Sequence, residues 1–334
     1  MYARWPGMDC LRYYVNCERN YLTLADALAA MKAARIHEYG GPEVIRYEDV
    51  EKPTAGEGQV LIKVAAAGFN PADRGDRSGG YRSVPLPFTL GFDVAGTVED
   101  VAEPIAGIAA GDRVIGRLDR GGPSAEYAIA PAEVLVRAPE SIPLPDAAAI
   151  PVAGLTAWQA VHEHAHVQSG QRVLVNGAGG GVGGFAVQLA KLAGAYVIAT
   201  ASARSADSVR AEGADEIIDY TTTSPADAVR EPVDAVLSLV PVSPEAGRSL
   251  AGLVRPGGVI VSITGQIEIP DDLGIKSTGF GARNDPEILA ELVRLVDSGE
   301  LIVDVAERLP LSELAEVHRR SEAGEIRGKV ILIP

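Results

Sequence analysis

The chain has 334 residues, of which 47% are hydrophobic and 22% charged, a composition typical of a folded globular protein rather than of a disordered or fibrous one. Its formal net charge of -15 disfavours binding to nucleic acid, since no local basic patch interrupts the acidic sequence. No apolar run approaches the roughly 18 to 20 residues that a membrane-spanning helix needs, so we expect no membrane segment. At this length we expect about two domains.

Residues 1–30 differ in character from the sequence that follows. They contain both cysteines, Cys10 and Cys17, and charged residues interrupt their apolar stretches, which is not the pattern of a secretory signal. We therefore expect a cytoplasmic protein with a loosely ordered N-terminal extension at residues 1–30. The organised pattern begins at Met31. A short regulatory or interaction arm is the alternative for the extension.

From Met31 to about Val136, short β-rich runs are divided by clusters of glycine and proline; among them are "QVLIKVAAAGF", "VAGTVEDV" and "DRVIGRL". This pattern predicts a compact, barrel-like β domain with little helix. From Asp146 onward strands and helices alternate, as in "RVLVNG", "GGFAVQLAKLAG" and "YVIAT", which predicts a doubly wound parallel sheet. After Gly274 comes a helix, "PEILAELVRLVDSGEL", and then a last strand that we expect to return to the first domain.

A glycine-rich turn, "NGAGGGVGG" at 176–184, follows the first strand predicted for the parallel sheet and opens onto a helix. Two overlapping registers satisfy G-x-G-x-x-G or its variant with alanine first. Glycines let the backbone approach a pyrophosphate, and free N–H groups at the helix start receive its charge. We expect a dinucleotide-binding turn; the alternative is a turn that merely permits close packing of helix on strand. The residues assigned to binding are Gly179, Gly180, Gly181, Val182 and Gly183.

The segment "HEHAH", His162 to His166, spells the H-E-x-x-H signature of zinc proteases. Such a site needs a third ligand, yet between Glu163 and Asp207 there is no Asp, Glu or His apart from His164 and His166. We interpret the segment as a solvated helix end of mixed charge.

Several segments together carry a resemblance to a known family; they include "AAGFNPADRGDRSGGY", "LGFDVAGTVEDV", "AAAIPVAGLTAWQAV", "GAGGGVGGFAVQLAKLAG" and the closing "GKVIL". The chain resembles the medium-chain dehydrogenase/reductase superfamily, in its zinc-free quinone oxidoreductase (zeta-crystallin-like) branch, over nearly all of residues 31–334. The resemblance implies an α/β fold with two domains and an active site in the cleft between them. One is a GroES-like β-rich catalytic domain, residues 31–150 and 275–334, and the other is a Rossmann domain with a doubly wound parallel sheet, residues 151–274.

Zinc-containing relatives differ from this chain at both metal-binding motifs. They place a cysteine ligand where this chain has Asn70, and a Gly-His-Glu where it has Gly91-Phe92-Asp93. Phe92 cannot bind a metal and no cysteine follows Cys17, so we expect no metal site. Without a Lewis acid, alcohol oxidation is disfavoured. The remaining chemistry is hydride transfer from a nicotinamide to a small-molecule quinone or α,β-unsaturated carbonyl.

We expect roles for four individual residues, those of Asn70 and Thr156 implied by the resemblance. Asn70 would orient substrate or cofactor at the nicotinamide end, although a structural Asx turn explains it too. Tyr81 would donate to a developing enolate, with aromatic packing as the alternative. Thr156 would lie near the nicotinamide ribose or the phosphates, or would simply be a hydroxyl at a helix start. Lys329, in "GKVIL", would contact the cofactor.

The second strand of the predicted Rossmann sheet ends without the acid that selects NAD. "YVIAT" is followed by "ASARSAD", whose first acid is Asp207. Ser202 and Arg204 stand in its place, and Tyr220 closes the following strand, a set that resembles the 2′-phosphate pocket of NADPH-dependent quinone reductases. We therefore expect NADPH as cofactor. The alternative for Arg204 is a surface arginine that points to water.

The sequence leaves two other functions open, and it does not fix the oligomeric state. An enoyl-thioester reductase shares the fold and the cofactor, and a redox-sensing or structural protein could bind NADPH without turnover. The family resemblance further implies a homodimer.

We predict that the purified protein carries no stoichiometric zinc and keeps its activity in a chelator, because Asn70 and Phe92 replace the family's ligands. Elemental analysis and assays before and after chelation test this. About one zinc per chain, lost together with activity, would contradict it.

Overall fold

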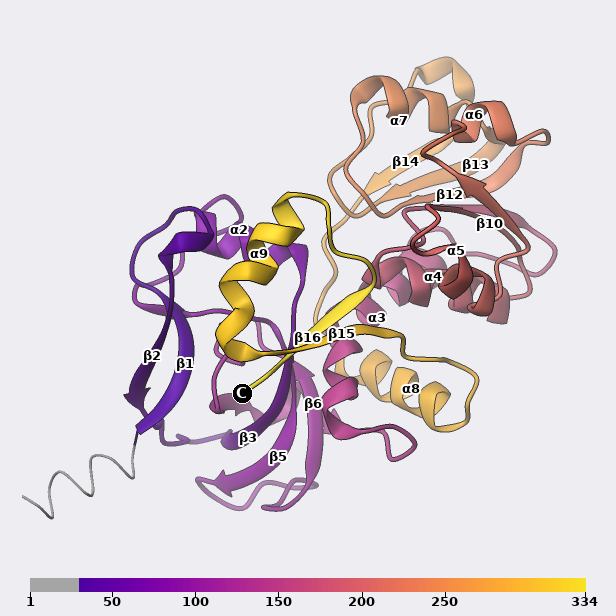
Figure 1. Ribbon diagram of the computed structural model, residues 1–334. Helices are drawn as coiled ribbons and strands as arrows, with labels where there is room; N and C mark the ends of the chain where they lie inside the picture. Colours follow the sequence, from indigo (N-terminus) through magenta and orange to yellow (C-terminus); the bar gives the residue numbers. More distant parts are fainter. Residues whose placement is uncertain (1–29) are drawn as a thin grey trace, which may run out of the picture.

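The structure is a computed structural model, and it describes residues 30–334. Figure 1 shows two lobes, one rich in strands and one with helices packed around a second sheet. The expectation for an extension at residues 1–30 lies outside the described residues except for Ala30, which opens the first strand.

The β-rich lobe is built around β3 (Gln59–Gly68), which pairs antiparallel with β5, β7 and β16. Its pairing with β16 confirms that the last strand returns to this lobe. The other elements of the lobe are β1 (Ala30–Ile36), β2 (Ile45–Glu51), α2 (Pro71–Ser78), β4 (Phe88–Thr89), β5 (Asp93–Val101), β6 (Arg113–Arg117), β7 (Tyr127–Pro131), β8 (Leu135–Arg137), β15 (Val305–Pro310), α9 (Leu314–Glu322) and β16 (Lys329–Ile333).

The second lobe contains a six-stranded parallel sheet in the order β11-β10-β9-β12-β13-β14. This is the order of a Rossmann sheet, and its two halves meet between β9 and β12. The lobe comprises β9 (Arg172–Asn176), α4 (Gly181–Leu192), β10 (Tyr196–Ala201), α5 (Ala206–Ala211), β11 (Glu216–Asp219), α6 (Pro225–Ala228), β12 (Val233–Ser238), α7 (Pro244–Ala251), β13 (Val254–Ser262) and β14 (Lys276–Gly279).

The central strands β9 and β12 are almost continuously buried, as expected for parallel strands covered on both faces. The sheet also takes in β14, beyond residue 274, where we expected this domain to end. The sequence of β14, "KSTG", has no apolar run that would mark it as a strand.

Two helices lie between the lobes, α3 (Pro151–Trp158) and α8 (Pro286–Asp297). The side chain of Asp285 caps α8 by accepting from the N–H groups of Glu287 and Ile288. Gly154 lets the two helices approach closely, since a Cβ there would lie 2.8 Å from Cδ1 of Leu292. One hydrophobic core therefore runs through both lobes.

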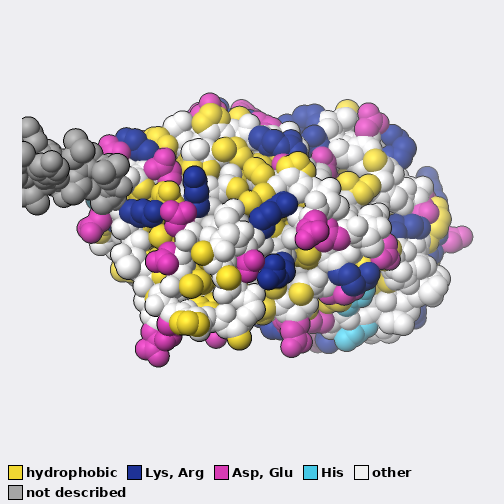
Figure 2. Space-filling model, turned by 90° about the horizontal axis from the view of Figure 1, so that it is seen from below, with side chains coloured by type: hydrophobic (Ala, Val, Ile, Leu, Met, Phe, Trp, Pro, Cys, Tyr) yellow, Lys and Arg dark blue, Asp and Glu magenta, His cyan; other side chains and the backbone are white. Residues whose placement is uncertain are grey.

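The surface mixes charges of both signs. On the face drawn in Figure 2, acidic and basic side chains are interspersed among apolar and uncharged polar ones. Within residues 30–334, the helices are all too short or too polar to cross a membrane.

Helix α2 begins after Asn70, and the side chain of Asp73, three residues further on, reaches back to it. The carboxyl of Asp73 accepts from the backbone N–H of Asn70 at 2.7 Å, while its other oxygen is buried and has no hydrogen-bond partner among the described residues. Only 2% of Asp73 is exposed, and this burial raises the pKa of its carboxyl to about 8. The folded chain therefore holds a proton on Asp73 at pH values where the unfolded chain has released it.

We predict that Asp73 makes the protein lose stability as the pH rises from about 4 to about 8. The slope is at most about 1.4 kcal/mol per pH unit for one group. Asp73→Asn keeps the acceptor oxygen but has no proton to release. Urea unfolding at pH 5.5 and pH 8 should show the variant gaining stability relative to the original chain as the pH rises. An unchanged difference at the two pH values would contradict the assignment.

Candidate active site

Three buried polar side chains meet where the two lobes join. Asn70 precedes α2, Asp93 opens β5 and Lys329 opens β16, and at most 4% of each is exposed. The amine of Lys329 donates to Oδ1 of Asn70 at 2.9 Å and to Oδ2 of Asp93 at 3.0 Å. Nδ2 of Asn70 donates to the same carboxylate oxygen at 2.9 Å. The expected Asn70 and Lys329 are thus brought together, with Asp93 between them.

The glycine turn lies at the carboxyl end of β9, next to the segment that leads into β16. Gly177 has a φ of 93°, which favours glycine. A Cβ at Gly183 would lie 2.4 Å from the carbonyl oxygens of Gly177 and Ala178, so this glycine serves close packing of α4 on the turn. Gly180 is exposed, and a Cβ there would have only one neighbour within 4 Å, at 3.4 Å. Gly183 therefore serves packing, whereas the space beside Gly180 is open to a ligand.

The start of α4 offers donors for an anion. The N–H groups of Gly181, Val182 and Gly183 lie in the first turn, where a helix provides no acceptors of its own. The helix dipole adds positive potential at this end. This arrangement is the physical basis of phosphate binding at helix starts.

The chain returns to this turn shortly before β16. Gly328 donates its N–H to the carbonyl of Gly179 at 3.0 Å, and Gly180 and Gly328 form a parallel bridge. Lys329 is the next residue. The returning segment thus connects the glycine turn directly to the cluster of Asn70 and Asp93.

The residues expected to bind a 2′-phosphate lie together at the carboxyl ends of β10 and β11. The backbone N–H of Tyr220 donates to the carbonyl of Ala201, directly before Ser202, at 3.3 Å. Arg204 is exposed, and within residues 30–334 its guanidinium makes only long contacts, 3.3 and 3.4 Å, with the carbonyls of Gly324 and Glu325. Tyr220 is 54% exposed. The guanidinium is therefore accessible to an anionic ligand.

Two expected residues have no hydrogen bond to the Asn70 cluster. The hydroxyl of Thr156 donates at 2.6 Å to the carbonyl of Val152 within α3, and the residue is 7% exposed. Tyr81 lies in the loop after α2 and is 59% exposed. Its phenol forms no hydrogen bond with residues 30–334, and its Cβ packs against the backbone of Gly75.

The first three residues of "HEHAH" end a π-helix, Gln159–His164, that continues α3, and the last two lie just beyond it. The ring of His164 packs on Phe280 with centroids 4.1 Å apart, and Glu163 pairs with the guanidinium of Arg283. The segment is a helix end of mixed charge whose Glu163–Arg283 pair is exposed, while Phe280 partly covers His164. No group of three or more His, Cys, Asp or Glu within residues 30–334 is placed to hold a metal.

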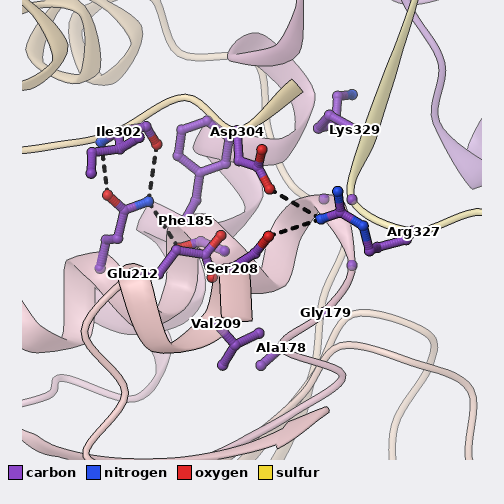
Figure 3. Close-up of a pocket in the computed structure, with 15 residues that line it drawn as sticks. Ala178, Gly179, Phe185, Ser208, Val209, Glu212, Ile302, Asp304, Arg327 and Lys329 are labelled. Carbon is purple, nitrogen blue, oxygen red and sulfur yellow. Dashed lines mark hydrogen bonds and ion pairs between the residues drawn. The ribbon is translucent and has the colours of Figure 1, made fainter. Parts of the chain in front are cut away.

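A small cavity lies behind the glycine turn, between α4, α5 and the returning segment (Figure 3). Its volume of about 20 Å³ is enough for one water molecule. Arg327 donates to Asp304 and Ser208 across it, and burial raises the pKa of Glu212 to about 8. In Figure 3 the amine of Lys329 points away from this cavity. The hydrogen bonds of Arg327 hold the returning segment against the second lobe. The cavity itself is too small for a dinucleotide.

A larger hollow of about 340 Å³ opens at the carboxyl edge of the parallel sheet. It is lined by Asn176 at the end of β9 and by residues of the α6 and α7 segments, among them Ser224 and Val242. Ligands of open α/β sheets bind outside the carboxyl ends of the strands, and this hollow has that position.

Sequence reasoning missed Asp93 as a site residue. It stands directly after Phe92, in the segment that corresponds to the Gly-His-Glu of zinc-containing relatives. That comparison concerns metal ligands and gives Asp93 no role of its own. Its complete burial together with a charge is visible only in the folded chain. A buried aspartate next to two other expected polar residues indicates a built polar site.

Comparisons with known proteins agree with this architecture. A family model described as an alcohol dehydrogenase GroES-like domain matches residues 56–140, and one described as a zinc-binding dehydrogenase matches residues 212–332. The quinone oxidoreductase of Pongo abelii is 33% identical over 93% of this chain and 100% of its own length. The NADPH-dependent alkenal/one oxidoreductase of Arabidopsis thaliana, a chloroplastic protein, is 31% identical over 91% of this chain and 80% of its own length.

A solved mycobacterial structure in complex with NADPH shares 30% identity and a TM-score of 0.80, covering 91% of this chain and 100% of its own. The expected pairing of a GroES-like domain with a Rossmann domain is confirmed by these matches and by the strand order. The chain belongs to the medium-chain dehydrogenase/reductase superfamily, in its quinone oxidoreductase branch.

Proposed function

We propose that the protein is an NADPH-dependent oxidoreductase that transfers a hydride to a quinone or an α,β-unsaturated carbonyl. The observation that carries this proposal is the bridge between Gly180 and Gly328, which connects the glycine-rich turn to the cluster that contains the buried amide of Asn70. The similar proteins named as quinone and alkenal/one oxidoreductases support the same reaction class.

The residues present fit NADPH. The open position at Gly180 and the donors at the start of α4 suit the pyrophosphate. The accessible guanidinium of Arg204, with Ser202 and Tyr220, suits a 2′-phosphate. The end of β10 has no carboxylate that would repel this phosphate. When bound, NADPH supplies the hydride.

The protein's own contribution is position and polarity. Asn70 has no useful pKa, so it orients its neighbours and does not carry protons. Hydride transfer to an electron-poor acceptor depends on holding the reacting atoms at the right distance and angle, which fixed polar groups at the lobe junction supply. We propose that this chemistry runs without a metal, since Asn70 and Phe92 occupy the positions of the family's ligands. Tyr81 and Thr156 stay proposed contacts of acceptor and cofactor.

Two rival functions are tested by the same assays. An enoyl-thioester reductase would prefer a thioester enone over simple quinones, and a binding protein would hold NADPH without consuming it. A panel of quinones, enones and enoyl-thioesters, followed by absorbance of the reduced cofactor, separates the three. The proposal also includes a cytoplasmic protein, supported by the character of residues 1–30, and a homodimer, which rests on family membership alone.

We predict that Arg204→Ala raises the Michaelis constant for NADPH at least about tenfold and leaves that for NADH nearly unchanged. A guanidinium–phosphate pair contributes on the order of 1.5 to 3 kcal/mol, and NADH has no 2′-phosphate to lose. Arg210→Ala is the matched control, because Arg210 is exposed on the neighbouring α5 and pairs with Asp207. Equal effects on both cofactors, or a preference of the original chain for NADH, would remove the support for NADPH.

A further inference from the structure

The amine of Lys329 has no hydrogen to spare. An ammonium group has three N–H donors, and this one makes three contacts, with Asn70, Asp93 and the carbonyl of Phe69 at 3.1 Å. The side chain is 4% exposed. To reach a phosphate it would have to leave Asp93 as a buried carboxylate without its cation, which is costly.

Asp93 is fixed just as firmly. Its Oδ1 accepts from the backbone N–H of Val152, at the start of α3, at 2.8 Å. The backbone around it is shaped to admit the carboxylate, since a Cβ on Gly68 would lie 2.8 Å from Oδ2. The carboxylate is thus anchored to the start of α3, independently of Asn70.

These two charges leave the amide of Asn70 a single orientation. Lys329 can only donate, so it must face the amide oxygen, and the ionised Asp93 can only accept, so it must face the amide nitrogen. The second hydrogen of Nδ2 has only a long contact, 3.4 Å, with the carbonyl of Gly68. It is the one donor of this amide left free to turn to another acceptor.

We propose that Asp93 and Lys329 are a buried positioning pair that holds the amide of Asn70 in one orientation for hydride transfer, and that Lys329 does not bind the cofactor phosphates. The inference rests on the proposed function for the reaction it serves. From the sequence alone, Lys329 is expected to contact the cofactor. In this structure its amine makes all three of its hydrogen bonds inside the protein.

The two roles for Lys329 predict opposite patterns in a matched pair of variants. A positioning pair requires that Asp93→Asn and Lys329→Gln behave alike, each lowering kcat at least about tenfold while the Kd for NADPH changes less than about threefold. If Lys329 instead binds the cofactor phosphates, Lys329→Gln alone weakens the binding of both NADPH and NADH, and Asp93→Asn leaves the binding of both unchanged. That second pattern would overturn the proposal.

A double variant and a control complete the experiment. Asp93→Asn with Lys329→Gln carries neither buried charge, so it stays informative if a single variant does not fold. We expect its loss in kcat to be no greater than that of the singles, because the pair acts as a unit. Lys191→Gln makes the same change at a lysine that pairs with Asp215 on the surface, and should leave kcat and Kd unchanged. Losses in the double variant that equal the product of the single losses would contradict a joint role.

A readout that needs no turnover separates this inference from the proposed function. The fluorescence of NADPH titrated into each variant gives the Kd, and the emission of the bound dihydronicotinamide reports its surroundings. If the original chain binds NADPH but reduces no acceptor, the proposed function fails. The positioning pair is then supported by altered bound emission at unchanged Kd in both single variants, and overturned by a raised Kd in Lys329→Gln alone.

Discussion

Asp93 is a carboxylate removed from water, and three groups from separate parts of the chain compensate for that removal. They are the amine of Lys329, the amide of Asn70 and the backbone N–H of Val152. A buried charge is tolerated only when it is paired and hydrogen-bonded, so each group constrains the others. The strands of the first lobe, the start of α3 and the last strand must therefore meet in one arrangement.

This constraint places the two halves of the site relative to each other. The last strand carries Lys329 into the cluster and, one residue earlier, Gly328 onto the glycine turn. The turn belongs to the second lobe and the cluster mainly to the first. A ligand that spans them meets groups whose spacing is set by backbone hydrogen bonds, which is the kind of preorganisation that positional catalysis requires.

Much of the fold could be predicted from the sequence, because local patterns carry it. The alternation from "RVLVNG" onward identified the parallel sheet, and the glycine turn lies where its strand and helix predicted. β14 was missed, since "KSTG" becomes a strand only through its neighbour β13. The packing of His164 on Phe280 was missed because Phe280 lies more than a hundred residues further along the chain. The role of Asp93 was hidden for the same reason, as its partner Lys329 is 236 residues away.

The bridge between Gly180 and Gly328 also sets an order of events during synthesis. The strands and helices of the parallel sheet are complete once residue 279 has left the ribosome, and that lobe can begin to fold as a unit. Its glycine turn then still lacks the neighbour that borders it, because Gly328 and Lys329 are translated some fifty residues later. A nascent chain at that stage has the dinucleotide fold but lacks Lys329, so the polar cluster with Asn70 and Asp93 is complete only at the end of translation.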